Sequence, residues 1–344
     1  MTEPDFGQTP EWLAFELDPA TDRVTLLRMT KEAYREASFL DQRILGPASE
    51  IRRTDWSALA AAVPEGARRD VQYIFHIGNV GSTLVSRLLG ELDAVLALRE
   101  PLLLRSFADR LGAVAPSPWP ETEAEARLDT LTAWLSRTYR PGQRALVKAT
   151  SFTGEIAGQL VPEGSRALFL FATPQHYVEN ILAGENSRQT LQMMSPTRLE
   201  RLRSRCPGLE LDLGQLSEAR KAALGWACEM SALEQSAARL PAGSVMWADF
   251  DRFLTNPAGH FAAVAAFFGH PVDAGRAQAI CTGSLMRRYS KALEYEYSPE
   301  LRREILAEAR WRHGRAIEDA LVWLDGLASR YPAVAQAIRR SQGS

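Results

Sequence analysis

From about residue 70 onward, short apolar runs alternate with segments of helical periodicity, and this alternation constrains the fold most. The apolar runs are as continuous as strands buried on both faces, and they are Val71–Ile77, Ala94–Leu98, Ala145–Lys148, Ala167–Ala172 and Ser244–Ala248. Strands that are joined through helices run parallel, because a crossover returns the chain to the same end of the sheet. The pattern therefore predicts an α/β fold, with a parallel sheet of about five strands flanked by helices.

The remaining segments predict an added N-terminal part and a helical end. Residues 1–66 show no clear strand alternation, although Thr30 to Phe39 favours a helix that Thr30 can cap. We interpret residues 1–66 as an N-terminal extension that packs on the core. Residues 67–344 are interpreted as one α/β domain, with C-terminal helices over 275–344.

Two Ser-Pro pairs are typical of helix starts, because serine caps a helix and proline fits its first turn. Ser195-Pro196 predicts a helix over residues 197–205, whose arginines we expect on a solvated face. Ser298-Pro299 predicts a second helix toward Leu324, which Gly314 is expected to divide.

Composition excludes several classes of protein. The 40 Lys and Arg residues nearly balance 42 Asp and Glu residues, and the net charge of -2 disfavours a general nucleic-acid binder. The sequence contains no apolar run of about 18 residues and no basic leader, so we expect no membrane insertion. Its three cysteines lack disulfide or metal-ligand spacing, and we expect a cytoplasmic protein.

The most informative segment joins the first clear strand to a helix through a glycine-bracketed turn. It reads VQYIFHIGNVGSTLVSRLLG over residues 71–90. Such a loop aims backbone N–H groups and the positive end of a helix at one anion. We predict that the anion-binding residues are Gly78, Asn79, Val80, Gly81, Ser82 and Thr83. The alternative is a tight turn with a structural role only.

This loop departs from the pattern of ATP and GTP enzymes. Gly81 is followed directly by Ser82, so the lysine of that pattern is missing. A later strand ends in Lys148, where such enzymes commonly carry an acidic Mg²⁺ ligand. Only four of the 40 basic residues are lysines, which makes Lys148 more informative. The pattern indicates transfer of a phosphoryl or sulfuryl group with a protein cation in place of a metal.

Taken in order, the motifs resemble the sulfotransferase family, whose members have a P-loop-type α/β fold and use 3′-phosphoadenosine-5′-phosphosulfate (PAPS) without a metal. The resemblance extends over about residues 73–268. It is carried by Asn79–Leu84 (the 5′-phosphosulfate loop), Val147–Thr150 (the third-strand lysine), Phe171–His176 (the 3′-phosphate segment), Trp247–Phe250 and Asn256-Pro257.

Three departures fall on donor-binding positions of the family. The cation of the loop is Asn79, the 3′-phosphate arginine is Ala172, and the serine of the following helix is Asn180. The resemblance implies that Asn180 binds the donor, with Arg188 replacing a missing cation. The basic cluster Arg287, Arg288 and Lys291 is a second replacement. Otherwise the donor has no 3′-phosphate, or donor chemistry is lost.

The resemblance also implies two catalytic roles. Cytosolic members place a histidine two residues after the third-strand lysine, but this position is Thr150. The protein-tyrosine and several carbohydrate enzymes use a glutamate just after the second strand, and Glu100 matches that arrangement. We therefore expect Glu100 as the base and Lys148 as the cation at the leaving group. A structural cap or a solvated ion pair is the alternative for Glu100.

These observations favour metal-independent transfer of a sulfuryl group from PAPS to a hydroxyl or amine acceptor. The acceptor is a small molecule, a carbohydrate or a peptide, and nothing in the sequence distinguishes these or fixes the oligomeric state, a homodimer included. One alternative is a P-loop kinase with an atypical phosphate loop. Another is a non-catalytic member that binds a phosphonucleotide or a partner protein. Residues Ser38–Arg43 are candidates to fold over the site, with Arg43 near a phosphate.

Overall fold

The computed structural model describes residues 9–112, 117–291 and 296–343, and its centre is a five-stranded parallel sheet. The strand order is β5-β6-β4-β7-β8. The strands are β4 (Gln72–His76), β5 (Val95–Arg99), β6 (Arg144–Lys148), β7 (Ala167–Phe171) and β8 (Val245–Asp249). Each predicted strand is present and every pairing is parallel, so the predicted fold class is confirmed.

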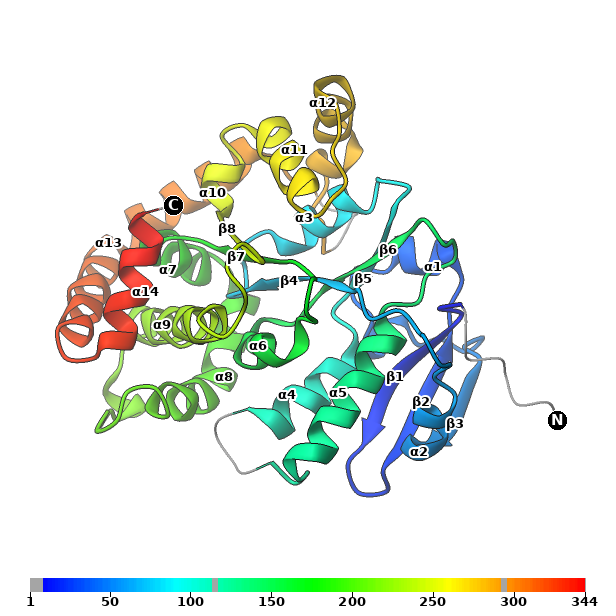
Figure 1. Cartoon of the computed structure of the whole chain (residues 1–344). Coiled ribbons are helices and arrows are strands. Elements are labelled where there is room, and N and C mark those ends of the chain that lie inside the picture. The colour runs from blue at the N-terminus through cyan, green and yellow to red at the C-terminus, as the bar shows by residue number, and fades with distance from the viewer. Residues whose placement is uncertain (1–8, 113–116, 292–295, 344) are drawn as a thin grey trace.

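Helices cover both faces of this sheet (Figure 1). In Figure 1, α3, α11 and α12 lie on one side, and α6, α8 and α9 on the other. The bounds are α1 (Lys31–Glu36), α2 (Trp56–Ala61), α3 (Ser82–Leu89), α4 (Leu102–Leu111), α5 (Glu121–Leu135), α6 (Ala157–Leu160), α7 (Pro174–Ala183), α8 (Glu185–Arg203), α9 (Glu218–Ala237), α10 (Phe250–Phe253), α11 (Pro257–Phe267), α12 (Ala274–Thr282), α13 (Pro299–Ala328) and α14 (Pro332–Gln342). Short 3-10 turns cover Gln42–Ile44, Ser151–Ile156, Leu213–Gln215 and Ser284–Arg287. Every residue of β4, β5 and β7 is buried, which explains their continuous apolar sequences.

The N-terminal region contains an antiparallel sheet that the sequence pattern did not predict. Its strands are β1 (Trp12–Asp18), β2 (Arg23–Arg28) and β3 (Ile51–Asp55). A register shift between Ala14 and Glu16 interrupts β1, and its first four residues are all buried, so no period-two alternation survives. The strand β3 lies at the sheet edge and is mostly exposed. Residues 1–8 of the proposed extension lie outside the described residues.

A buried arginine joins this N-terminal region to the end of β5. The predicted cap of α1 is confirmed, because the Thr30 side chain accepts from the Ala33 N–H. At the other end of α1, the guanidinium of Arg99, only 2% exposed, donates to the carbonyls of Tyr34, Arg35 and Ala37. Carbonyls at a helix C-terminus lack intrahelical partners, so one cation satisfies several of them.

The helix predicted to begin at Ser195-Pro196 is wrong in its start. Instead α8 runs without interruption from Glu185 to Arg203, with Pro196 inside it. Proline removes one backbone hydrogen bond, and the Ser195 hydroxyl donates to the Leu191 carbonyl at 2.6 Å. Extensive packing of α8 on α9 stabilises the helix despite the proline.

The prediction that the arginines of this helix lie on a solvated face is also wrong for three of them. Arg198 pairs with Glu229 at 3.1 Å, and both side chains are buried. Glu155 pairs with Arg201 at 2.8 Å and with Arg205 at 2.6 Å. Buried charges require partners, so these pairs fix α8 against α9 and against the segment that follows β6.

The second Ser-Pro helix is confirmed. Ser298 caps α13 by accepting from the Leu301 N–H, and Pro299 is its first residue. The helix continues through Gly314 to Ala328, so the expected division at Gly314 is wrong. A single interior glycine costs only about 1 kcal/mol, which the packing of α13 on α7 and α9 offsets. Among the described helices, none has the length and apolar character needed to cross a membrane.

We predict that Arg99→Met destabilises the fold. Three carbonyls of the α1 terminus lose a charged donor, and we expect the free energy of unfolding to fall by about 2 to 3 kcal/mol. Urea denaturation measures this change. The matched control is Arg23→Met, because Arg23 is exposed and pairs with Asp55 at the surface; its effect is expected within about 0.5 kcal/mol. Equal losses for the two variants would contradict the role of Arg99.

Candidate functional site

The strands β4, β5 and β6 are parallel, so their carboxyl ends lie at the same end of the sheet. There the glycine-bracketed loop leads from β4 into α3. The loop needs backbone angles that most residues avoid, with φ of 86° at Gly78, 54° at Asn79 and 67° at Gly81. Glycine adopts these angles without a steric penalty, and asparagine tolerates them better than most side chains. The Val80 side chain is buried in the core.

Gly81 is required by its surroundings as well as by its backbone. A Cβ atom at this position would lie 1.9 Å from the ring of Phe250, which is almost completely buried at the start of α10. The aromatic ring therefore lies directly against the loop. Beyond Gly81, Ser82 and Thr83 begin α3, and both side chains are buried.

Buried Lys148 and partly buried Glu100 form an ion pair at the carboxyl ends of these strands. The Lys148 ammonium, with no exposed surface, donates to Glu100 Oε1. The backbone adds a second link, because the Glu100 N–H donates to the Lys148 carbonyl. Burial lowers the pKa of Lys148, and the adjacent Glu100 carboxylate opposes that shift. The two residues predicted to act together are thus in direct contact.

His76 lies next to this ion pair and is uncharged. Burial, followed by the charges of Lys148 and Lys291, lowers its pKa well below the usual value. Its Nδ1 accepts from the Gly78 N–H at 3.0 Å, so the proton lies on Nε2. That atom is 4.0 Å from Glu100 Oε1 and has no hydrogen-bond partner among the described residues. Period-two counting along the sequence places His76 opposite Tyr73, Phe75 and Ile77, and it leaves two interpretations open, a contact with the acceptor or a core histidine.

Lys291 enters the site from the distant C-terminal part of the chain. Its Nζ lies 3.4 Å from Asn79 Oδ1. Burial, followed by the charge of Lys148, lowers its pKa to about 8. Arg287 and Arg288, the other members of the predicted basic cluster, are exposed. The sequence signal for this cluster was only its charge, which did not distinguish Lys291.

The two other predicted donor-binding residues have different positions. The Asn180 side-chain amide donates to the Asn79 carbonyl at 2.8 Å, and so holds the loop. Arg188 lies on α8 and pairs with Glu185 at 2.6 Å and with Glu218 at 3.9 Å. The structure therefore brings Asn180 to the loop and directs the charge of Arg188 toward neighbouring carboxylates.

The segment from Ser38 to Arg43 covers the ion pair. Lys148 Nζ lies 5.4 Å from the centre of the Phe39 ring, and the Arg43 guanidinium stacks at 3.5 Å on the same ring. Arg43 is also bonded to Asp41. This is the place that sequence analysis proposed for the segment.

Two cavities adjoin these residues. A cavity of about 100 Å³ lies at the loop, with Asn79, Gly81 and Thr83 in its lining. A larger groove of about 1190 Å³ has Phe39 and Arg43 in its lining. Thr83 is 2% exposed, and its buried hydroxyl has no hydrogen-bond partner among the described residues. A buried, unpaired donor at a loop of this kind is suited to an anion.

These residues fit one end of PAPS better than the other. The 5′-phosphosulfate end would be held by the loop, the Thr83 hydroxyl and Lys291. At the position of the family's 3′-phosphate arginine, Ala172 is buried and its carbonyl accepts from Trp226 Nε1 at 2.9 Å. The nearby cation Arg302 is bound to Asp251 at 2.8 Å. In place of the family's arginine, the segment after β7 presents His176, whose Nδ1 lies 3.1 Å from Asp251 Oδ2.

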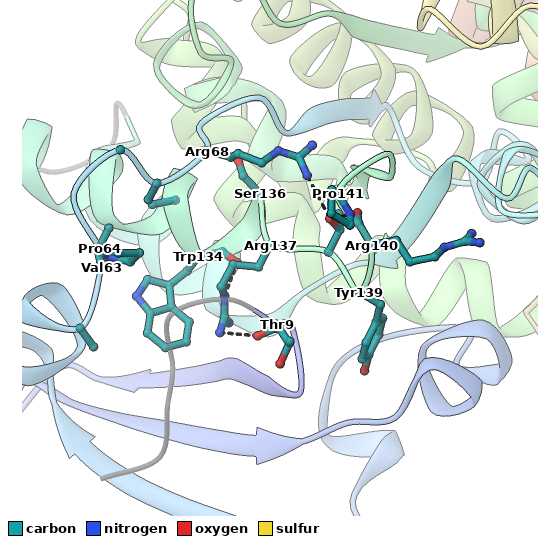
Figure 2. Close-up of a pocket in the computed structure, with 15 residues that line it drawn as sticks. Thr9, Val63, Pro64, Arg68, Trp134, Ser136, Arg137, Tyr139, Arg140 and Pro141 are labelled. Atoms are coloured by element: carbon teal, nitrogen blue, oxygen red, sulfur yellow. Dashed lines mark hydrogen bonds between the residues drawn. The ribbon is translucent and has the colours of Figure 1, made fainter.

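Another cavity, of about 410 Å³, lies near the amino ends of β4 and β6 (Figure 2). Its lining comes from segments that precede β4 and β6, and it includes Trp134, Arg137 and Tyr139. Figure 2 shows the Arg137 guanidinium beside Thr9, whose carbonyl accepts from it at 2.9 Å. None of the predicted site residues lines this cavity. Among the described residues, no cluster of three or more His, Cys, Asp or Glu side chains is arranged to hold a metal ion.

We predict that Gly81→Ala destabilises the protein by about 1 to 3 kcal/mol, through backbone strain and the clash with Phe250. Urea denaturation measures the loss, and Gly142→Ala, at an open position, is the control. In a Phe250→Ala background the cost of Gly81→Ala is expected to be smaller, because the clash is gone. An unchanged cost in that background would contradict the contact.

No family model matches the chain, and no curated protein matches it. In solved structures, it is similar to a sulfotransferase domain from the curacin biosynthetic pathway, with 14% identity, a TM-score of 0.43, and coverage of 67% of this chain and 84% of that chain. Sulfotransferase STF9 from Mycobacterium avium has 13% identity and a TM-score of 0.37, with 74% and 78% covered. Mouse sulfotransferase SULT7A1, complexed with PAP, has 9% identity and a TM-score of 0.36, with 79% and 89% covered. Each of these three proteins is a sulfotransferase, which is the family that the motifs of this chain resemble.

Proposed function

We propose that this protein transfers a sulfuryl group from PAPS to a hydroxyl or amine acceptor without a metal. The observation that carries the proposal is the buried Glu100–Lys148 pair beside the phosphate loop. Strand β6 ends in a cation, where a nucleoside-triphosphate enzyme commonly needs a magnesium ligand. The base and the cation that the reaction requires are therefore adjacent.

The proposed roles follow from charge. The acceptor oxygen or nitrogen bonds to sulfur while the bond from sulfur to the 5′-phosphate oxygen breaks, and that oxygen keeps the electron pair. Glu100 takes the proton of the acceptor. Lys148 neutralises the charge that develops on the departing oxygen. A donor anion near Lys148 competes with Glu100 for the ammonium, so donor binding frees the carboxylate to act as a base.

His76 and the groove would complete the arrangement. Neutral His76 lies beside the carboxylate, with Nε2 4.0 Å from Glu100 Oε1, and so adds no charge that would compete with Lys148. The large groove beside Phe39 offers space for a small molecule, a carbohydrate or a peptide as acceptor. The Phe39 ring contacts both Lys148 and Arg43. It would have to move for an acceptor to reach Glu100 from this side.

The donor assignment is tested by calorimetric titration with adenosine 3′,5′-bisphosphate in the absence of metal, beside ATP with Mg²⁺. Binding of the bisphosphate supports PAPS as the donor. Binding of ATP with Mg²⁺ alone would favour an atypical P-loop kinase. Binding of the bisphosphate without transfer to any acceptor would favour a non-catalytic phosphonucleotide-binding protein, which the missing cation at Ala172 also favours.

We predict that Glu100→Gln lowers the turnover of PAPS by about 10²- to 10⁴-fold, because the amide cannot accept the proton. Release of adenosine 3′,5′-bisphosphate measures turnover with phenol and amine acceptors. The affinity for the bisphosphate is expected to stay or rise, since a negative charge near the anion is removed. Glu163→Gln, at an exposed turn before β7, is the control. Full turnover in Glu100→Gln would exclude Glu100 as the base.

A further inference from the structure

We propose that Lys291 supplies the positive charge that the phosphate loop lacks at Asn79, and that it binds the phosphate or sulfate group held there. The identity of that group rests on the proposed function, but the anion site does not. The ligand class is any molecule with a terminal phosphate or phosphosulfate group.

The first support is the position of Lys291 relative to the loop. Lys291 Nζ is 3.4 Å from Asn79 Oδ1, although the two residues are 212 positions apart. Its side chain lines the small cavity at the loop and also the large groove. Among the described residues, it is the one that both linings share. A cation there faces the anion on one side and the acceptor on the other.

The second support is that the backbone beside Lys291 is anchored to the phosphate helix. The carbonyl of Ser290 accepts from Arg87 Nε at 3.1 Å, and from the Ser38 hydroxyl at 3.3 Å. Arg87 lies on α3, is 6% exposed, and also donates to the Ser38 hydroxyl at 2.8 Å. The helix that begins at the loop therefore fixes both the segment that carries Lys291 and the segment that covers Lys148.

The third support is the absence of a counter-ion. Among the described residues, no carboxylate forms an ion pair with Lys291, whose contact at the loop is the neutral amide oxygen of Asn79. A partly buried ammonium without an anion is costly, and that cost falls when an anion binds. The unpaired hydroxyl of Thr83 lines the same cavity.

The charge of Lys291 makes anion binding depend on pH. The charged groups that face it are Lys148 on β6, Glu100 after β5 and Arg43 on the covering segment, while His76 on β4 is neutral. Arg302 of α13, paired with Asp251, and Tyr289 and Tyr297 share its cavity. The pKa of Lys291 is about 8, so its positive charge is present below pH 8 and is lost as the pH rises through 8. Affinity for an anion is therefore expected to fall above that pH.

The test is calorimetric titration of the full chain with two probes, inorganic phosphate and adenosine 3′,5′-bisphosphate, at pH 7 and pH 9. Lys291→Met is expected to weaken both probes by about 10- to 100-fold at pH 7, the loss expected for one charged hydrogen bond. It is also expected to remove most of the fall between pH 7 and pH 9. Lys291→Arg is expected to bind at both pH values, because arginine stays protonated. The control is Lys221→Met, far from the loop on α9.

A rescue distinguishes lost charge from lost structure. In Asn79→Lys/Lys291→Met the cation returns to the family's own position, and we expect at least a tenfold recovery over Lys291→Met. Urea denaturation of each variant checks that it is folded. The proposal is overturned if both Asn79→Lys/Lys291→Met and Lys291→Arg are folded and neither binds the two probes. The charge of Lys291 is then not what binds the anion.

The outcomes separate this inference from the proposed function. If the wild type binds both probes and Lys291→Met binds them equally well, the inference on Lys291 is overturned and PAPS remains the proposed donor. If the wild type binds phosphate through Lys291 but rejects the bisphosphate, the inference holds and PAPS as donor is overturned. If the wild type binds neither probe, both are overturned.

Discussion

The site depends on one buried ion pair, that of Lys148 with Glu100. The charge of Lys148, which is fully buried, would be unstable alone, since an isolated buried ion costs several kcal/mol. The pairing is built into the sheet, because the register of β5 and β6 places Arg99 opposite Lys148 and brings the next residue, Glu100, to the end of the pair. The proposed base and the proposed cation therefore lie next to each other as an ion pair. Any ligand that engages one partner changes the state of the other.

Closing this pair off from water requires parts of the chain that are far apart in sequence. Arg99 holds the C-terminal carbonyls of α1, and the segment after α1 carries Phe39 over Lys148. Arg87 holds Ser38 of the same segment and the Ser290 carbonyl beside Lys291. Two buried arginines, one at the end of β5 and one in α3, thus connect α1, the segment after it and the C-terminal segment to the candidate site.

Local patterns predicted the parts of the fold that local physics determines. Buried parallel strands give continuous apolar runs, and the loop angles at Gly78 and Gly81 require glycine, so the five strands and the loop could be found. A bulge hid the strand β1, and tertiary packing carried α8 through Pro196. The buried arginines of α8 were misjudged because their partners, Glu155 and Glu229, lie elsewhere in the sequence. Sequence analysis named Lys291 only as one of three basic residues, because only the folded chain shows that it faces Asn79.

This arrangement gives a physical reason for Asn79 at the loop position where the family has a cation. The loop needs φ of 54° at this position, which asparagine adopts more readily than lysine. Its carbonyl accepts from Asn180 and its side-chain oxygen from Lys291, so one residue holds the loop shape and receives the cation. Because Asn79 shapes the loop and Lys291 supplies the charge, the loop does not need a lysine at a positive φ. This arrangement also places the charge on a lysine that burial has already shifted toward neutral pH, so affinity for the anion and the protonation state of the site become coupled.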